Sequence, residues 1–149
     1  MTTPPRRPLN HSLVRALRRV PDFAALEDGV LLKVVGASAN LFWPTGSVVF
    51  KQGSPSEGLY IVLAGRVRIT NGPAEKEDDD IAQIGPGDYF GELSLLRNSQ
   101  HTKSAQAIED SEIMVLPKRS FEALMRTDAD LAEQMRTKRA EFAEGPPLS

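Results

Sequence analysis

The stretch that decides the fold is residues 84–96, which read IGPGDYFGELSLL. It places a glycine-rich turn directly before a short apolar segment that we predict to be helical. Glycine lets the backbone approach a ligand closely, and the free N–H groups at a helix start favour negative charge. Glu92, at that start, offers only acceptor oxygens, which suit sugar hydroxyls. The pattern indicates an anion cradle, but glycine-rich turns before helices are common, so the flanking sequence has to decide.

The flanking sequence indicates many short strands. Between Leu41 and Pro117, apolar or alternating runs are broken by Gly, Pro, Asn and Ser. In the run 66–70, Val67 and Ile69 face one way and the polar residues face the other. Evenly spaced short strands favour a sandwich or a barrel-like roll. The acidic run 75–80 is interpreted as a solvated hairpin loop rather than a cation site. The expected strands are 40–43, 48–51, 59–63, 66–70, 81–84, 103–107 and 112–116.

Helical periodicity appears at both ends of the chain. Asn10 or Ser12 is expected to cap a first helix, and a second covers residues 28–35 with Gly36 as its stop. After Pro117 the spacing becomes helical again, with one segment from Lys118 or Ser120 and a last helix over 128–143. The expected buried positions are Leu13, Val14, Leu17, Phe121, Leu124, Met125, Leu131, Met135 and Phe142. The predicted organisation is a flexible basic tail at 1–9, one domain at 10–143 and a flexible tail at 144–149.

Composition excludes several classes of function. The chain has 149 residues, of which 40% are hydrophobic and 26% charged, and its net charge is −2, so direct binding to nucleic acid or an anionic membrane is not expected. There is no cysteine, and the two histidines lie far apart, so we expect no metal site and no cofactor. We find no catalytic set of nucleophile and base, and expect no enzyme. Without a secretory signal or a membrane span, the expected location is the cytoplasm.

Beyond residues 84–96, three further motifs carry a resemblance: PTG at 44–46, FKQG at 50–53 and LYIVLAGRV at 59–67. Together they resemble the strand-and-glycine framework of the cyclic nucleotide-binding domain family, which occurs in catabolite activator-type regulators, kinase regulatory subunits and gated channels. The resemblance covers roughly residues 20–142. It implies an α+β, mainly β fold: a double-stranded β-helix, or jelly-roll-like β-roll, with N-terminal helices and two C-terminal helices.

The resemblance also implies a ligand site. Residues 91–94 correspond to the family's phosphate-binding cassette, in which Glu92 accepts from the ribose 2′-hydroxyl and backbone N–H groups of Gly91 and Ser94 face the sugar and phosphate. The implied ligand is cyclic AMP or cyclic GMP. The candidate ligand-binding residues are Gly91, Glu92, Leu93, Ser94, His101, Thr102 and Lys103.

The sequence departs from the family where the cassette closes. The family has Pro-Arg-(Ala/Ser/Thr)-Ala, whereas residues 100–103 here read QHTK, with His101 in place of the arginine that pairs with the phosphate. Losing a bidentate, permanently charged contact costs on the order of 2–4 kcal/mol. His101 is either a weaker phosphate ligand or a surface residue. Thr102 matches the family position whose hydroxyl bonds the phosphate or a guanine edge.

Lys103 stands where the family has a small residue. A strand continuing from His101 would place Lys103, Ala105 and Ala107 on one face with the histidine, inside the roll. Lys103 then either supplies part of the missing charge at the phosphate, or is turned outward by a bulge or by snorkelling.

Two functions remain open. In the first, the domain senses a cyclic nucleotide, and the C-terminal helix closes over the ligand and signals to an effector protein that the sequence does not identify. Arg136 and Arg139 on that helix either reach the nucleobase or form a solvated face. In the second, the fold is degenerate and serves as a protein–protein docking module, such as a homodimer through the last helix, without binding nucleotide.

Overall fold

The computed structural model describes residues 6–71 and 80–143, so most of the predicted acidic loop and residues 1–5 and 144–149 lie outside the described residues. Short strands dominate its centre, as the alternating runs predicted. The strands are β1 (Ala39–Trp43), β2 (Val48–Phe50), β3 (Gly58–Ala64), β4 (Val67–Thr70), β5 (Asp80–Ile84), β6 (Tyr89–Phe90), β7 (Ser104–Ala107) and β8 (Ser111–Pro117).

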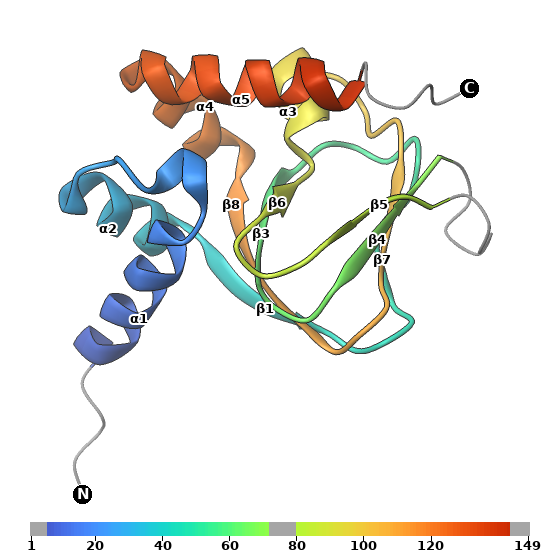
Figure 1. Cartoon of the computed structure of the whole chain (residues 1–149), viewed down its shortest axis with the longest axis horizontal. Coiled ribbons are helices and arrows are strands. Elements are labelled where there is room, and N and C mark those ends of the chain that lie inside the picture. The colour runs from blue at the N-terminus through green and yellow to red at the C-terminus, as the bar shows by residue number, and fades with distance from the viewer. Residues whose placement is uncertain (1–5, 72–79, 144–149) are drawn as a thin grey trace, which may run out of the picture.

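These strands form two four-stranded antiparallel sheets, in the orders β1-β8-β3-β6 and β2-β7-β4-β5. Strands distant in sequence pair closely: Tyr60 lies opposite Val115, and Arg68 lies opposite Gln106. The two sheets curl around a common interior to make the roll seen in Figure 1. The predicted α+β, mainly β fold is confirmed.

Helices cover one side and one end of the roll. They are α1 (Arg6–Arg18), the 3₁₀ turn η1 (Pro21–Phe23), α2 (Asp28–Ala37), α3 (Glu92–Arg97), α4 (Lys118–Thr127) and α5 (Ala129–Ala143). In Figure 1, α3, α4 and α5 lie across the upper end, while α1 and α2 flank one side. Asp128 caps the last helix, because the backbone N of Leu131 donates to Asp128 Oδ1 at 2.9 Å.

Alternation along β3 divides the core into two clusters. Leu59 and Ile61 face the helices, where they pack with residues such as Phe121 and Met135. Tyr60 and Val62 face the interior of the roll. Because both faces of β3 are buried, its sequence is a continuous apolar run rather than an alternating one.

Two expectations differ from the structure. Helix α1 begins at Arg6 rather than at Asn10 or Ser12, because Pro8 falls in the first turn, where proline is tolerated. Gly36 does not stop α2, which runs to Ala37. In β4, the polar residue Arg68 is buried, and its Nη1 donates to Gln106 Oε1 on β7 at 2.6 Å.

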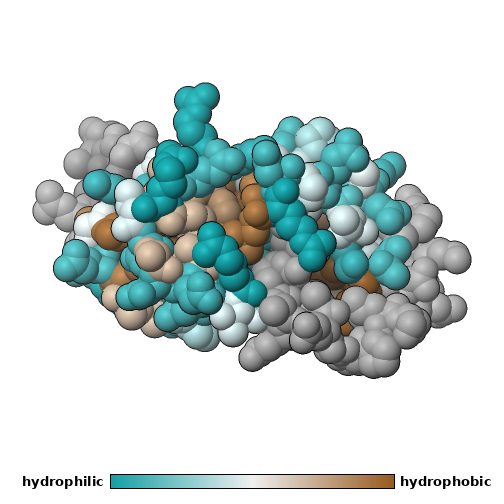
Figure 2. All heavy atoms as spheres, turned by 90° about the horizontal axis from the view of Figure 1, so that it is seen from above, coloured by the Kyte–Doolittle hydropathy of each residue, from teal (hydrophilic) through white to brown (hydrophobic). Residues whose placement is uncertain are grey.

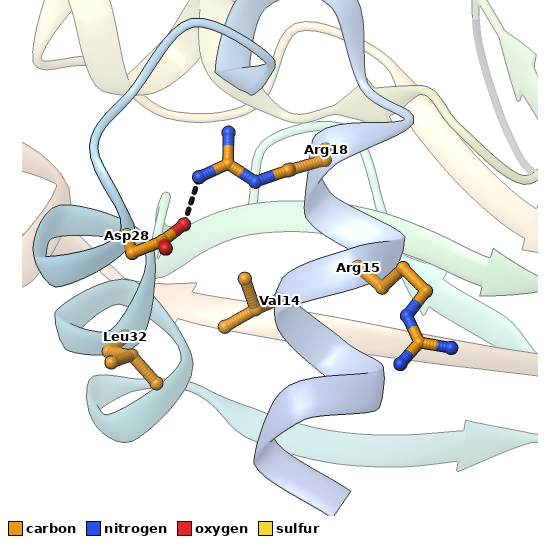
Figure 3. Close-up of a pocket in the computed structure, with 5 residues that line it drawn as sticks. All are labelled: Val14, Arg15, Arg18, Asp28 and Leu32. Atoms are coloured by element: carbon orange, nitrogen blue, oxygen red, sulfur yellow. Dashed lines mark hydrogen bonds and ion pairs between the residues drawn. The ribbon is translucent and has the colours of Figure 1, made fainter.

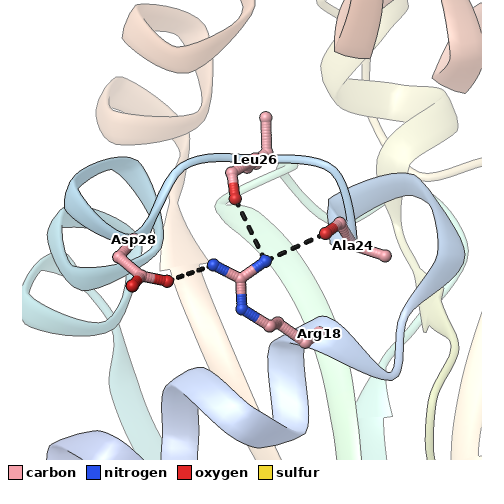
Figure 4. Close-up of polar contacts among 4 residues, drawn as sticks. All are labelled: Arg18, Ala24, Leu26 and Asp28. Carbon is pink, nitrogen blue, oxygen red and sulfur yellow. Dashed lines mark hydrogen bonds and ion pairs between the residues drawn. The ribbon is translucent and has the colours of Figure 1, made fainter.

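Side chains fix the N-terminal helices to one another and to the roll. Arg18 on α1 donates to the carbonyl oxygens of Ala24 and Leu26 at 2.9 and 3.2 Å and pairs with Asp28 at the start of α2 (Figure 4). The guanidinium of Arg18 thus binds three residues of the connection between α1 and α2 and holds that connection in place.

A second side-chain contact joins η1 to β6, the strand that leads into the cassette. The Tyr89 hydroxyl on β6 donates to the Asp22 carboxylate, and the Tyr89 ring meets Phe23 edge-on at a centroid distance of 6.2 Å. Burial, followed by the bond to Asp22, raises the pKa of the Tyr89 phenol. The hydroxyl therefore stays a donor at any working pH.

Replacing Tyr89 by phenylalanine tests this link. Tyr89→Phe removes the donor while keeping the ring, so the free energy of unfolding should fall by about 1–2 kcal/mol in urea titrations. In a double-mutant cycle with Asp22→Ala, the double variant should be no less stable than the worse single variant. Strictly additive losses would mean that the two groups do not interact.

Candidate functional site

The cassette depends on a glycine turn between β6 and α3. Gly91 has φ of +87°, a left-handed conformation that side chains disfavour, and a Cβ there would lie 2.9 Å from Tyr60 Cδ1. Only glycine fits both constraints. This turn places Glu92, which is half-buried, at the first position of α3.

The segment that closes the cassette is held by backbone hydrogen bonds to the loop between β2 and β3. The amide of His101 donates to Ser54 O at 2.9 Å, and its carbonyl accepts from Gly53 N at 2.7 Å. These bonds fix where the His101 side chain can lie. The alternative that His101 is a surface residue is wrong, since the residue is 3% exposed.

The His101 ring bridges the cassette and the roll. It stacks flat on Phe50 of β2, with ring centroids 3.6 Å apart and an interplanar angle of 4°. Its Nδ1 lies 3.2 Å from Ser94 Oγ on α3. Nε2 is buried with no hydrogen-bond partner among the residues that the structure describes, a state that costs about 1–3 kcal/mol.

Burial also controls the charge of this ring. It lowers the pKa of His101 from 6.5 to about 4, because the imidazolium would be cut off from water. At neutral pH the position that carries a permanent guanidinium in the family therefore carries no charge. The phosphate end of the cassette differs from the family in charge and in shape.

The ring belongs to a larger aromatic cluster inside the roll. Phe50 lies 5.3 Å from Tyr60 and 5.8 Å from Phe90, and Trp43 meets Tyr60 edge-on at 6.3 Å, all as centroid distances. Trp43 and Tyr60 therefore pack with other rings of the core. Aromatic side chains of the roll interior thus pack against His101 of the cassette through Phe50.

The two candidate residues after His101, Thr102 and Lys103, differ in how far they are buried. Thr102 is exposed, and its carbonyl accepts from Gln52 Nε2 at 3.3 Å. Lys103 is half-buried, and its Nζ donates to Asn71 Oδ1 at 3.4 Å, at the end of β4. The predicted strand 103–107 begins one residue later, at Ser104. Lys103 therefore precedes the strand that was expected to place its side chain inside the roll.

Two lid candidates lie on α5. Arg136 is exposed, and the side chain of Arg139, like that of Leu93 in the cassette, lies outside the described residues. The structure thus brings together Ser94 and His101, and places Gly91 and Glu92 at the start of the same short helix. Sequence reasoning missed Phe50, the stacking partner. Its place as the first residue of FKQG predicted only a strand residue, and the register of β2 with β7 was needed to bring it to His101.

Hollows also lie between helices in the described part of the chain. A cleft of about 350 Å³ lies between α1 and α2, where Val14 and Leu32 face each other below the Arg18–Asp28 pair and Arg15 points away (Figure 3). A groove of about 420 Å³ lies between α2 and α4, with Val34, Ala37 and Leu124 among its apolar lining residues. The described part of the chain contains no group of three or more His, Cys, Asp or Glu placed to hold a metal ion, and no helix there is long and apolar enough to cross a membrane.

The roll, with a glycine turn leading into a short helix at its upper end and two C-terminal helices packed there, defines a β-roll domain. The sequence matches the family described as cyclic nucleotide-binding domain over residues 41–128, and the chain belongs to that family. The resemblance inferred from the glycine framework is confirmed.

Similar proteins come from several regulatory systems. The cyclic AMP receptor protein of Thermus thermophilus is 37% identical over 84 residues, which are 56% of this chain and 39% of that protein. The cGMP-dependent protein kinase, isozyme 1, of Drosophila melanogaster is 27% identical over 124 residues, or 81% of this chain and 16% of the kinase. The crystal structure of the Thermus thermophilus catabolite activator protein matches with a TM-score of 0.70 and 30% identity, covering 81% of this chain and 57% of that one. This chain therefore spans well under two thirds of each.

The buried neutral histidine predicts how stability depends on pH. The folded pKa of about 4 lies below the unfolded value of 6.5, so the unfolded chain binds the proton first as pH falls. The contribution is fully present above pH 6.5 and is lost between 6.5 and 4. From pH 7 to pH 5 the wild type should lose about 2 kcal/mol more unfolding free energy than His101→Asn, which keeps an atom facing Ser94.

Urea titrations at the two pH values measure this difference, and His11→Asn is the matched control for the other histidine. The control should behave as the wild type. Equal pH dependence in the wild type and His101→Asn would show that His101 titrates normally in the folded protein.

Proposed function

We propose that the domain senses a cyclic mononucleotide, cyclic AMP or cyclic GMP, and signals through movement of its C-terminal helix to an effector protein. The observation that carries this proposal is the intact cassette turn: Gly91 in its left-handed conformation, Glu92 beginning α3, and Ser94 facing the closing segment. We assign no catalytic role to any residue. The domain would act by binding alone.

The proposed contacts follow the family's site residue by residue. Glu92 would accept from the ribose 2′-hydroxyl, and the backbone N–H groups of Gly91, Leu93 and Ser94 would face the sugar and phosphate. His101, Thr102 and Lys103 would surround the phosphate from the closing segment. For Lys103, this role requires its side chain to leave Asn71, which it contacts in the structure.

Contacts between the cassette and the C-terminal helices support the proposed route of the signal. Asn98, which ends α3 in a left-handed conformation, accepts at Oδ1 from Lys118 Nζ at the start of α4, at 2.8 Å. Helix α3 also packs on α5, which in turn contacts η1. A ligand that shifts α3 would change the packing of α5, and can do so only by its differential affinity for the two arrangements. Arg136 and Arg139 would then approach the nucleobase.

The effector would lie in a partner protein or in sequence outside this chain. In the family, this type of domain accompanies separate output units, and this chain spans only a part of the relatives it matches. We propose the cytoplasm as its place of action.

One observation favours a second function, a docking or dimerisation module that binds no nucleotide. The His101 ring already packs on Phe50, and it is uncharged at neutral pH. Apolar side chains remain on the surface, with Leu32, Leu41 and Phe42 exposed by 44, 46 and 62%. Figure 2, viewed from the side of α4 and α5, shows apolar surface gathered between hydrophilic side chains. Such surface marks interaction sites when it is contiguous.

Restoring the arginine separates the two functions. His101→Arg should strengthen binding of cyclic AMP or cyclic GMP by roughly 30- to 1000-fold in calorimetric titrations at pH 7.5, because the guanidinium supplies a bidentate charged contact. His11→Arg adds the same charge elsewhere and should leave the affinity unchanged.

Circular dichroism and urea unfolding establish that the His101→Arg variant is folded. Absence of binding to either nucleotide at millimolar concentration, in both the wild type and a folded His101→Arg protein, would reject the sensor and leave the docking module.

A further inference from the structure

The unpaired Nε2 of His101 is the most unusual polar atom in the described structure. The residue is 3% exposed, and Ser94 occupies the other ring nitrogen. If the serine hydroxyl donates to Nδ1, the ring proton lies on Nε2 and has no acceptor. If Nδ1–H donates to the serine, the Nε2 lone pair has no donor. Either tautomer leaves one side of the ring unsatisfied.

A second unsatisfied atom lies in the loop that holds this histidine. Ser56 Oγ is buried without a hydrogen-bond partner among the described residues, two positions after Ser54, whose carbonyl binds the His101 amide. Buried polar atoms nearly always have a hydrogen-bond partner in the protein, in ordered water or in a bound ion, so Nε2 and Ser56 Oγ are two positions at which a bound molecule would find an unused polar group.

An anion can accept a hydrogen bond from Nε2–H of a neutral ring, but only a ring protonated on both nitrogens also brings the positive charge that the family's arginine supplies. An imidazolium donates from Nε2 to the anion and from Nδ1 to Ser94 Oγ, so both ring bonds are made at once. We propose that the phosphate end of this cassette is a proton-coupled anion site, at which a monoanionic phosphodiester binds together with one proton that is taken up by His101. This inference rests on the proposed binding of cyclic nucleotide.

In the free protein, the charged residues on the elements that pack against the ring do not keep His101 protonated. On the elements that hold the ring, the charged residues are Lys51 and Glu57 of the β2–β3 loop and Glu92 and Arg97 of α3; Lys103 follows on the histidine's own segment. Lys51 and Arg97 are exposed. The pKa of His101 is lowered by burial alone, so the free site has no partner that holds the ring protonated. The ligand itself has to supply the negative charge.

Such coupling makes affinity depend on pH in a defined direction. Between the low pKa of the free site and the higher pKa of the occupied site, each unit of lower pH should strengthen binding of the anion by up to about tenfold. A neutral nucleoside, which has the same base and sugar but no phosphate, should show no such dependence. Neutral and anionic ligands are therefore matched probes of the phosphate end.

The decisive experiment counts protons. The full chain is titrated calorimetrically at pH 6 with cyclic AMP and cyclic GMP, in two non-phosphate buffers that differ in ionisation enthalpy. We expect uptake of up to one proton per bound cyclic nucleotide, clearly above zero, and none per bound adenosine or guanosine. His101→Gln should bind the cyclic nucleotide with no proton uptake and a flat pH profile, whereas His11→Gln should match the wild type.

The outcomes separate this inference from the proposed function. Binding of cyclic nucleotide without proton uptake, or with uptake that persists in His101→Gln, would overturn the proton-coupled site and leave the sensor intact. Failure of the wild type and of His101→Arg to bind any cyclic nucleotide between pH 5 and 8 would overturn both.

Discussion

The stacking of His101 on Phe50, completed by the contact with Ser94, is the constraint on which the rest of the site depends. It joins β2 to the cassette helix α3 and the closing segment, which follow one another in the chain but are far from β2 in sequence. It also removes the ring from water and holds it neutral. A family position that ordinarily provides permanent charge has become part of the aromatic core, so under the proposed function the electrostatics of ligand binding would depend on whether a proton accompanies the ligand.

The cassette is tied to helices at both ends of the chain. Towards the N-terminus, Tyr89 on β6 bonds to Asp22 in η1, two positions before the Gly91 turn. Towards the C-terminus, Asn98 at the end of α3 bonds to Lys118 at the start of α4. Because the same short segment carries both links, a displacement of α3 cannot leave the surrounding helices unchanged. This arrangement suits a domain whose output is a change of helix packing.

The glycine framework and the alternating runs were sufficient to predict the roll, the flanking helices and most strand positions to within one or two residues. Strand β6 was missed because two residues give no periodicity. The burial of Arg68 could not be predicted, since it depends on pairing with Gln106 from a strand 38 positions further along the chain. Counting along the motif located His101 correctly, but sequence spacing contains no information about Phe50. The environment of His101, and hence its charge, therefore required the register of two distant strands.

The central claim is that His101 is a buried, neutral group in the free protein, and NMR titration of its ring tests this most directly. The protein has only two histidines, so ring ¹³C and ¹⁵N signals can be assigned with a single His11→Asn variant. We expect the ligand-free His101 to titrate with a pKa near 4, and to move upward when cyclic nucleotide is present. A pKa of 6.5 or above in the free protein would contradict the account, because the ring would then be charged or solvated without any ligand.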